Sequence, residues 1–278
     1  MKSLIRKCID VVKDDIDGVC ADATPGSSNC LNCFQKQYFD ENLITYDCNY
    51  KINIYVAKYF PVHVKENSVA LNLLSSDFML ELFKHSSINI MSIGGGPGSD
   101  SYAVKKYLTE CENQGDITSQ KDIYLLRVDK EENWNNTAGE VNSIISDTGN
   151  LIFNAKRHHF DVTIKEEWMK RSFRTFNIFT ISYFLSELTD KAQVETVAEC
   201  INRCSSEEVS CLFINDRNDE KVRSFQRVLF DNLSCNTDYE VEDSSRHHCG
   251  FFYDNDDKDL ISPKLSTKSI RFLKVLYI

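Results

Sequence analysis

The spacing of apolar residues changes near residue 87 and divides the chain into two parts. Over residues 49–83, apolar side chains recur at intervals closer to 3.6 than to 2, which predicts helices. We expect two or three helices there, interrupted near Pro61, because proline lacks a backbone N–H and clashes with the preceding turn. A stretch rich in Gly, Pro and Ser at residues 18–32 separates them from an amphipathic first helix. The pattern therefore predicts a helical region over residues 1–86.

From residue 88 onward, short apolar runs alternate with longer helical or polar segments. Near-continuous apolar strands that alternate with helices indicate a parallel sheet with both faces covered. Two late segments, residues 247–254 and 268–278, leave no room for a crossover helix between them, so they predict an antiparallel pair at one edge. We therefore expect an α/β domain over residues 87–278. Its other strands are predicted at residues 88–93, 122–129, 157–162, 176–182 and 210–216.

A glycine-rich turn joins the first predicted strand to a helix expected from about residue 99 to 109. Glycines let the backbone turn tightly and approach a ligand without an intervening Cβ, and the helix N-terminus offers free N–H groups. The third position of the dinucleotide-binding fingerprint falls on Ser99, so that match fails. A phosphate-binding P-loop is excluded because no lysine lies between the glycines and Lys105. The glycines of this turn are Gly94, Gly95, Gly96 and Gly98.

The Gly-x-Gly-x-Gly spacing resembles motif I of class I S-adenosylmethionine-dependent methyltransferases, and the resemblance extends over residues 88–216. It implies a Rossmann-like class I methyltransferase fold, with a mainly parallel seven-stranded sheet and an antiparallel last strand. It also implies that S-adenosyl-L-methionine is the cofactor and that the four glycines meet its amino-acid end and ribose. On the same resemblance, the helical region preceding the sheet covers the pocket for the methyl acceptor.

Acidic residues after the later strands occupy further positions of this resemblance. Asp129 stands where a carboxylate takes both ribose hydroxyls, a charge-assisted arrangement. Asp161 stands where an acid meets the adenine amino group, with Val162 against the ring, although an Asp there also begins turns and helices. Ser92 replaces the acid that such proteins often carry before the glycines. The contact to the cofactor's amino group is therefore altered or supplied by Asp100.

The segment ISYFLSEL, residues 181–188, occupies the motif IV position where the acceptor approaches in such proteins. Ser182, Tyr183 and Glu187 are the catalytic candidates, and Glu187 is the first to test as a base or an acceptor-orienting group. Its carboxylate also suits the first turn of a helix. The Asn/Asp-Pro-Pro-Tyr/Phe signature is absent, which argues against enzymes that methylate exocyclic amines of bases.

The nature of the methyl acceptor stays open at this level. The pattern IGGGPGSD, the acid and tryptophan of VDKEENW and the late SPKLSTKSIRFLKVLYI resemble fungal ribosomal RNA uridine-N3 methyltransferases, and SYFLSEL resembles mitochondrial ribosome-assembly factors. These likenesses favour an RNA base slightly. The alternatives are a non-catalytic protein that binds the cofactor as a sensor or assembly factor, and a methyltransferase of small molecules. Oligomeric state is likewise open.

Charge and cysteine content bear on partners and compartment. The 278 residues include 42 acidic and 32 basic side chains, a formal net charge of −10, which repels a polyanion unless basic residues cluster locally. No apolar run is long enough for a membrane span. Eleven cysteines without a signal sequence indicate reduced thiols in the cytoplasm or nucleus. A zinc site at Cys20, Cys30, Cys33 and Cys48 is disfavoured by their uneven spacing, so no metal is expected.

Overall fold

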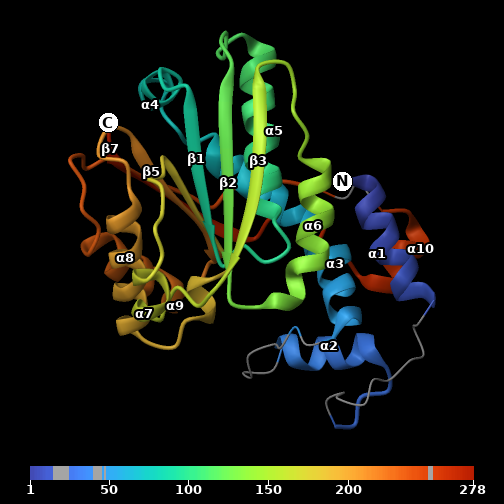
Figure 1. Ribbon diagram of the computed structural model, residues 1–278. Helices are drawn as coiled ribbons and strands as arrows, with labels where there is room; N and C mark the ends of the chain where they lie inside the picture. Colours follow the sequence, from blue (N-terminus) through green and yellow to red (C-terminus); the bar gives the residue numbers. More distant parts are fainter. Residues whose placement is uncertain (15–24, 40–45, 47, 250–252) are drawn as a thin grey trace.

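The computed structural model describes residues 1–14, 25–39, 46, 48–249 and 253–278. Its centre is a seven-stranded sheet in the order β3-β2-β1-β4-β5-β7-β6 (Figure 1). Strand β7 runs antiparallel to both of its neighbours, and the other strand pairs are parallel. The predicted architecture, an α/β fold with a mainly parallel seven-stranded sheet and an antiparallel last strand in the sequence, is thereby confirmed. The strands are β1 Ser87–Ile93, β2 Lys121–Asp129, β3 Leu151–His159, β4 Ile178–Ser182, β5 Ser210–Arg217, β6 Glu240–Asp243 and β7 Ser269–Tyr277.

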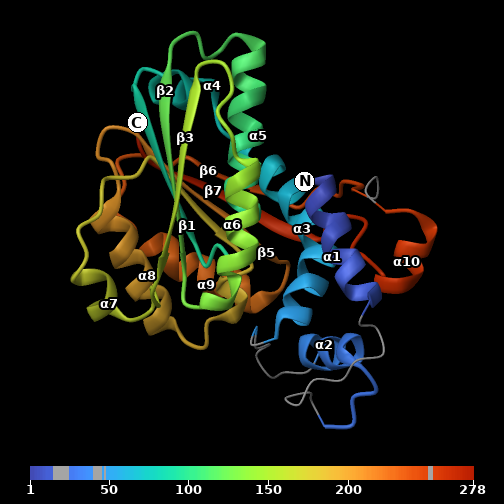
Figure 2. The same cartoon turned by 45° about the vertical axis from the view of Figure 1, so that its right-hand side comes forward.

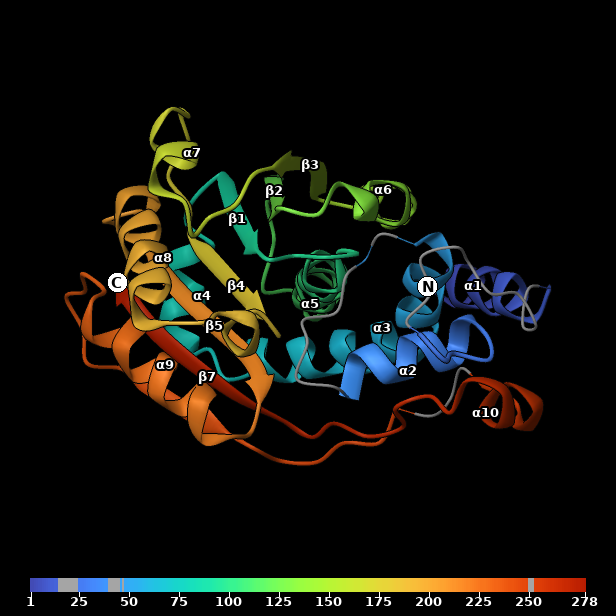
Figure 3. The ribbon, with the colours of Figure 1, turned by 90° about the horizontal axis from the view of Figure 1, so that it is seen from below.

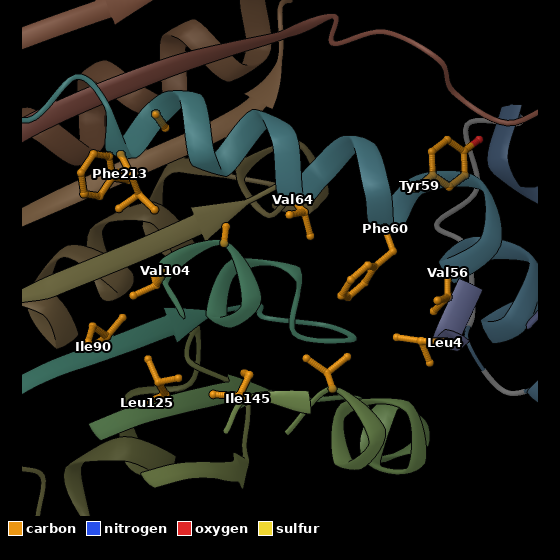
Figure 4. Packing of buried hydrophobic residues seen from close by; sticks show 14 of the residues in the cluster. Leu4, Val56, Tyr59, Phe60, Val64, Ile90, Val104, Leu125, Ile145 and Phe213 are labelled. Carbon is orange, nitrogen blue, oxygen red and sulfur yellow. The ribbon is translucent and has the colours of Figure 1, made fainter. Parts of the chain in front are cut away.

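Helices cover both faces of the sheet, as the near-continuous apolar strands require. One face packs against α3 and α5, and Figure 4 shows Phe60 and Val64 of α3 near Val104 of α5 and Ile90 of β1. The other face packs against α8 and α9 (Figure 3). These helices are α3 Asn49–Leu71, α5 Ser99–Gln114, α8 Lys191–Cys204 and α9 Glu220–Asp231. Two shorter helices lie in the connections between strands: α6 Asn135–Ile144 between β2 and β3, and α7 Lys165–Met169 between β3 and β4.

The N-terminal helices join the first core. Helix α1, Lys2–Asp14, packs on α3 and meets α10, Asn255–Ile261, a helix that comes late in the sequence (Figure 2). The buried Asp257 of α10 accepts from Arg6 Nη1 at 3.0 Å and from Lys13 Nζ at 3.2 Å. Helices α2, Cys30–Phe39, and α4, Ser76–Leu82, complete this region. The first and last parts of the chain are thus held together.

The predicted interruption near Pro61 is wrong, because α3 continues through it for 23 residues. Proline removes the N–H that would bond the carbonyl of Ala57 four residues earlier. The hydroxyl of Tyr253 donates to that carbonyl oxygen at 2.6 Å, and the backbone N–H of Lys264 donates to the carbonyl of Lys58 at 3.2 Å. The C-terminal segment therefore satisfies an acceptor that Pro61 leaves free, which allows the helix to continue.

Two predicted strands lie elsewhere. The third strand occupies residues 151–159 rather than 157–162, because it is an edge strand in which only Leu151 is buried and the other residues are partly buried or exposed, so it forms no continuous apolar run. Strand β7 pairs with β5 and β6 and not with residues 247–254. In that segment His248 forms an isolated bridge with Ser266. Residues 250–252 of that segment lie outside the described residues. The helix predicted at 99–109 extends to Gln114.

Candidate functional site

The glycine turn lies at the carboxyl edge of the sheet, directly after β1. The strand order reverses between β1 and β4, and open α/β sheets bind ligands at such a switch point. The N–H of Gly95 donates to the carbonyl of Val128 at 3.1 Å, and Gly98 N–H donates to the carbonyl of Gly95 at 2.8 Å. The turn is therefore tied to the end of β2 and positioned where a ligand would lie.

The glycines of the turn have different reasons to be glycine. Gly94 has φ +61°, and a Cβ there would lie 2.5 Å from the Phe184 ring. A Cβ on Gly95 would lie 2.6 Å from Cγ of Arg127. These two glycines make room for the protein's own side chains, whereas the sequence suggested room for a ligand. Gly96, at φ +45°, would meet nothing nearer than Trp134 at 3.9 Å, so it is the position most open to a ligand.

Arg127 supports the turn from inside the sheet. It lies in β2 with 5% of its surface exposed, and Nη1 donates to the carbonyl of Gly96 at 2.7 Å. Nη2 donates to Oδ1 of Asn135 at 3.2 Å. Burial lowers the pKa of the guanidinium to about 10, so it stays charged at neutral pH. The sequence analysis did not single out Arg127, although one arginine within the apolar run YLLRVD was the available signal.

Asp129 ends β2 and binds the turn through its carboxylate. Oδ2 accepts from the N–H of Gly96 at 2.7 Å, and Oδ1 accepts from the N–H of Glu131 at 2.9 Å. Burial raises its pKa. A carboxylate has about four acceptor positions, so each oxygen can accept one further hydrogen bond from a ligand. The structure thus brings Asp129 and the glycines together, as predicted.

Asp161 and Val162 follow β3 at the same edge. Oδ1 of Asp161 accepts from the N–H and the hydroxyl of Thr163 at 2.9 and 2.7 Å. Asp161 therefore stabilises its own loop, while Oδ2 has no hydrogen bond among the described residues. Val162 is buried in the core cluster on the α8 side. Contacts of both residues with an adenine ring stay predictions.

Asp100 lies behind the turn, in the first turn of α5, with 1% of its surface exposed. Its oxygens lie 2.9 Å from Asn67 Nδ2 of α3, 2.9 Å from Thr180 Oγ1 of β4 and 3.2 Å from Ser99 Oγ. Thr180 Oγ1 also lies 2.9 Å from Oγ of Ser92. Burial raises the pKa of Asp100 to about 6. Thr180 therefore connects Ser92 to the carboxylate of Asp100. This carboxylate is enclosed by protein groups, and its predicted contact with the amino group of the cofactor stays a prediction.

Ser182 and Tyr183, two of the predicted catalytic residues, are anchored to α3. Ser182 Oγ donates to Asn67 Oδ1 at 2.7 Å. Tyr183 has a left-handed backbone, φ 55°, an uncommon conformation that is enriched at functional sites. Its hydroxyl lies 3.1 Å from Oε2 of Glu66 and accepts from Lys264 Nζ at 2.8 Å. The sequence analysis missed Glu66 and Lys264, which lie far from Tyr183 along the chain.

Glu66 is fully buried and collects several donors in addition to Tyr183. The ring of His63 lies 3.1 Å away through Nδ1, Lys264 Nζ lies at 3.5 Å and the N–H of Lys268 lies at 3.3 Å. Burial acts to raise the pKa of Glu66, but these partners outweigh it and keep the carboxylate ionised. Burial lowers the pKa of His63, so its neutral ring donates from Nδ1. We call His63, Glu66, Tyr183 and Lys264 the Glu66 cluster.

Glu187 ends a short 3-10 helix, Leu185–Glu187, next to the same edge. No hydrogen bond holds its carboxylate among the described residues. Desolvation by surrounding protein, then the charges of Asp129 and Asp216, raise its pKa to about 8. Of the three predicted catalytic residues, Glu187 is therefore the one with an uncommitted functional group near Asp129.

Asp216 at the end of β5 is fully buried and caps this short helix. It accepts from the N–H of Ser186 at 3.1 Å and from its neighbour Arg217 at 2.7 Å. Burial raises its pKa to about 6. The charges of Asp216 and Asp129 both raise the pKa of Glu187, so these three carboxyl groups influence one another electrostatically.

When the pH is raised from about 4.5 to 6.5, we expect the free energy of unfolding to fall less in the Asp216→Asn variant than in the wild type. Because its folded-state pKa is raised, Asp216 holds a proton in the folded protein that the unfolded chain releases, so its contribution falls as pH rises through this range. Asparagine removes that dependence. Between these two pH values, the free energy of unfolding of the wild type should fall by about 2 kcal/mol more than that of the variant. Urea denaturation of both proteins at both pH values measures this. Parallel pH profiles would contradict this assignment.

Aromatic rings line the other side of the turn. Trp134 lies 5.2 Å from Tyr55 of α3 and 4.4 Å from Tyr46, between ring centroids, and is buried. Phe184 is half-buried against Gly94. Trp134 therefore packs with the N-terminal helices, while Phe184 covers the start of the turn.

Metal ligands and membrane spans were also sought in the structure. Over the described ranges, no group of three or more His, Cys, Asp or Glu side chains is arranged to hold a metal ion. Cys30 and Cys48 are free thiols, and Cys20 lies outside the described residues. Within that same part of the chain, no helix has the length and apolar character that crossing a membrane requires.

Comparison with solved structures finds several likenesses at low sequence identity. The N-methyltransferase NodS from Bradyrhizobium japonicum, in complex with S-adenosyl-L-homocysteine, matches with a TM-score of 0.40 and 13% identity, over 76% of this chain and 84% of its own. An S-adenosylmethionine-dependent methyltransferase from Clostridium acetobutylicum gives 0.41 and 10%, over 77% and 91%. The mitomycin 7-O-methyltransferase MmcR gives 0.49 and 13%, over 88% and 60%. No protein-family model and no curated protein matches the sequence.

Proposed function

We propose that this protein transfers a methyl group from S-adenosyl-L-methionine to an acceptor. The observation that carries the proposal is the hydrogen bond from the Gly96 N–H to Asp129 at 2.7 Å. It joins the open glycine of the turn and a carboxylate with spare acceptor positions, at the point where the strand order reverses. A ligand with two neighbouring hydroxyl groups fits that carboxylate, as the ribose of the cofactor requires.

The residues present fit this cofactor in charge as well as in hydrogen bonding. S-adenosyl-L-methionine supplies a methyl group already activated on a positively charged sulfur. Asp129 provides a carboxylate at the turn, where a cation is favoured. Holding the acceptor about 3 Å from the methyl group supplies on the order of 7 kcal/mol of the acceleration. Burial raises the pKa of Glu187 to about 8, so this group is mostly protonated at neutral pH, and its ionised form is the one suited to take a proton from an acceptor that must lose one.

Replacing Asp129 by alanine should weaken binding of S-adenosyl-L-homocysteine roughly 10- to 150-fold. This corresponds to about 1.5 to 3 kcal/mol, the usual contribution of hydrogen bonds to a charged group. Isothermal titration calorimetry measures it. Asp122→Ala is the matched control, because Asp122 lies on the same strand at the opposite end and is exposed. Failure of the folded wild-type protein to bind S-adenosyl-L-homocysteine would overturn the proposed function.

The non-catalytic alternative has one observation in its favour. The hydroxyl groups of Ser182 and Tyr183 are engaged with Asn67, Glu66 and Lys264, which leaves Glu187 as the uncommitted candidate. Incubation with methyl-labelled cofactor and fractionated cell extract separates the possibilities. Label in the RNA fraction supports the RNA acceptor that we favour, and label in the metabolite fraction supports a small-molecule acceptor. Cofactor binding without transfer to any fraction supports a sensor or assembly factor.

A further inference from the structure

Basic residues gather in one part of this acidic protein. The chain carries a net charge of −10, yet residues 156–174 contain six Lys and Arg against three Asp and Glu. Most of these six side chains are exposed. They lie on the edge strand β3 and on the segment that leads through α7 to β4. A polyanion repelled by the rest of the surface is attracted here.

Four of these cations, together with Lys130 at the end of β2, form a surface that we call the basic strip. No Asp or Glu oxygen lies within 4 Å of their charged nitrogens in the described ranges, whereas Lys165 of the same segment, and Lys84 and Arg223 elsewhere, have such partners. Contacts make the strip continuous at the sheet edge, because His159 hydrogen-bonds the carbonyl of Lys130 and Arg171 Nη2 donates to the carbonyl of His159 at 3.2 Å. The strip consists of Lys130, Lys156, Lys170, Arg171 and Arg174.

Aromatic rings lie among the cations of the strip. The guanidinium of Arg174 lies 4.5 Å from the centroid of the Tyr124 ring, and Tyr124 is half-buried on the neighbouring strand β2. The ring of Phe173, also half-buried, lies 6.4 Å from His158 of β3. Cations that follow a phosphate backbone, together with rings on which bases stack, are the features that bind single-stranded nucleic acids.

The strip reaches the candidate site at the carboxyl edge of the sheet. Lys130 directly follows Asp129, and its charge opposes the rise in pKa of both Asp129 and Glu187. Strand β3 ends at His159, beside the carboxyl end of β2, where Asp129 pairs with His159 (Figure 1). A chain bound along β3 would therefore arrive next to the glycine turn.

We propose that the basic strip binds the phosphate backbone of a single-stranded RNA and leads one of its bases to the site. That the bound base is methylated rests on the proposed function. Binding of the RNA to the strip does not depend on it. An anionic membrane is the less suitable occupant, because the strip follows a strand edge with half-buried rings and lacks an amphipathic helix to insert. RNA is thus the acceptor class that the charge distribution favours.

The test measures binding of a fluorescent single-stranded RNA of about twelve nucleotides to the full chain by anisotropy. Five phosphate contacts predict a slope of about −3.5 in log affinity against log salt, or roughly 100-fold weaker binding at 200 mM than at 50 mM. The double variant Lys156→Glu with Arg174→Glu should bind at least about tenfold more weakly and reduce the slope by about 1.4. Both side chains are exposed and lie outside the cofactor site.

The control variant, Lys2→Glu with Lys191→Glu, reverses two exposed cations on α1 and α8. It should weaken RNA binding by no more than about twofold for each charge reversed. All proteins are also titrated with S-adenosyl-L-homocysteine, whose binding reports on the proposed function separately. Salt-insensitive or undetectable RNA binding would overturn the inference, as would an equal loss in the control variant. Binding to vesicles of anionic phospholipid but not to the RNA would replace the RNA with a membrane and also overturn it.

Discussion

The Glu66→Ala variant is expected to lose about 3 to 5 kcal/mol of stability, because two hydrogen-bond donors lose their acceptor at roughly 1 to 3 kcal/mol each. Alanine leaves the buried His63 N–H and the Tyr183 hydroxyl without the acceptor they share, and leaves Lys264 beside no carboxylate. Urea denaturation near pH 7 measures the loss. Because Tyr183 is anchored through Glu66, the free energy of unfolding should fall together with the affinity for S-adenosyl-L-homocysteine.

The Glu66→Gln variant is the matched control for this result. Glutamine keeps the shape and one acceptor oxygen, so Tyr183 retains its partner, while His63 can change tautomer to accept from the amide. We expect its loss of stability to stay within about 2 kcal/mol. Equal losses in the Ala and Gln variants would show that the side-chain volume of Glu66, rather than its acceptor oxygens, stabilises the Glu66 cluster.

The Gly94→Ala variant is expected to bind S-adenosyl-L-homocysteine at least roughly 30-fold more weakly than the wild type. A side chain at φ +61° costs about 1 to 2 kcal/mol, and its Cβ would lie 2.5 Å from the Phe184 ring. The turn or Phe184 must therefore move, and the Gly96 N–H that binds Asp129 lies two residues away. Calorimetry measures the binding, and thermal unfolding checks that the variant folds.

Gly115→Ala provides the control for backbone strain. Gly115 also has a left-handed backbone, φ +87°, but its added Cβ would have no neighbour within 4 Å. This variant should lose comparable stability from strain and keep its affinity for S-adenosyl-L-homocysteine. The double variant Gly94→Ala with Phe184→Ala removes the close contact and should recover part of the binding. Unchanged binding in Gly94→Ala alone would contradict the role given to this turn.

The parts of the site next to strand ends were predictable because neighbours in the sequence remain neighbours in the fold. The glycine turn follows β1 and Asp129 ends β2, and adjacent parallel strands bring their carboxyl ends to one edge. The Glu66 cluster was not predictable in this way. Glu66 and Tyr183 are 117 residues apart, and Lys264 lies another 81 residues beyond Tyr183. Their meeting depends on how α3 and the C-terminal segment pack across the sheet.

The sequence by itself determined the fold class, because near-continuous apolar strands can be buried only in a sheet covered on both faces. It also determined the place of the turn, since glycine alone tolerates these backbone angles without strain. Tertiary structure decided whether Pro61 ends a helix, because the hydroxyl of Tyr253 replaces the hydrogen bond that proline cannot make. It likewise decided which carboxylates are enclosed and which remain uncommitted. Asp100 and Glu187 differ in that respect because burial and hydrogen bonding depend on segments distant in the chain.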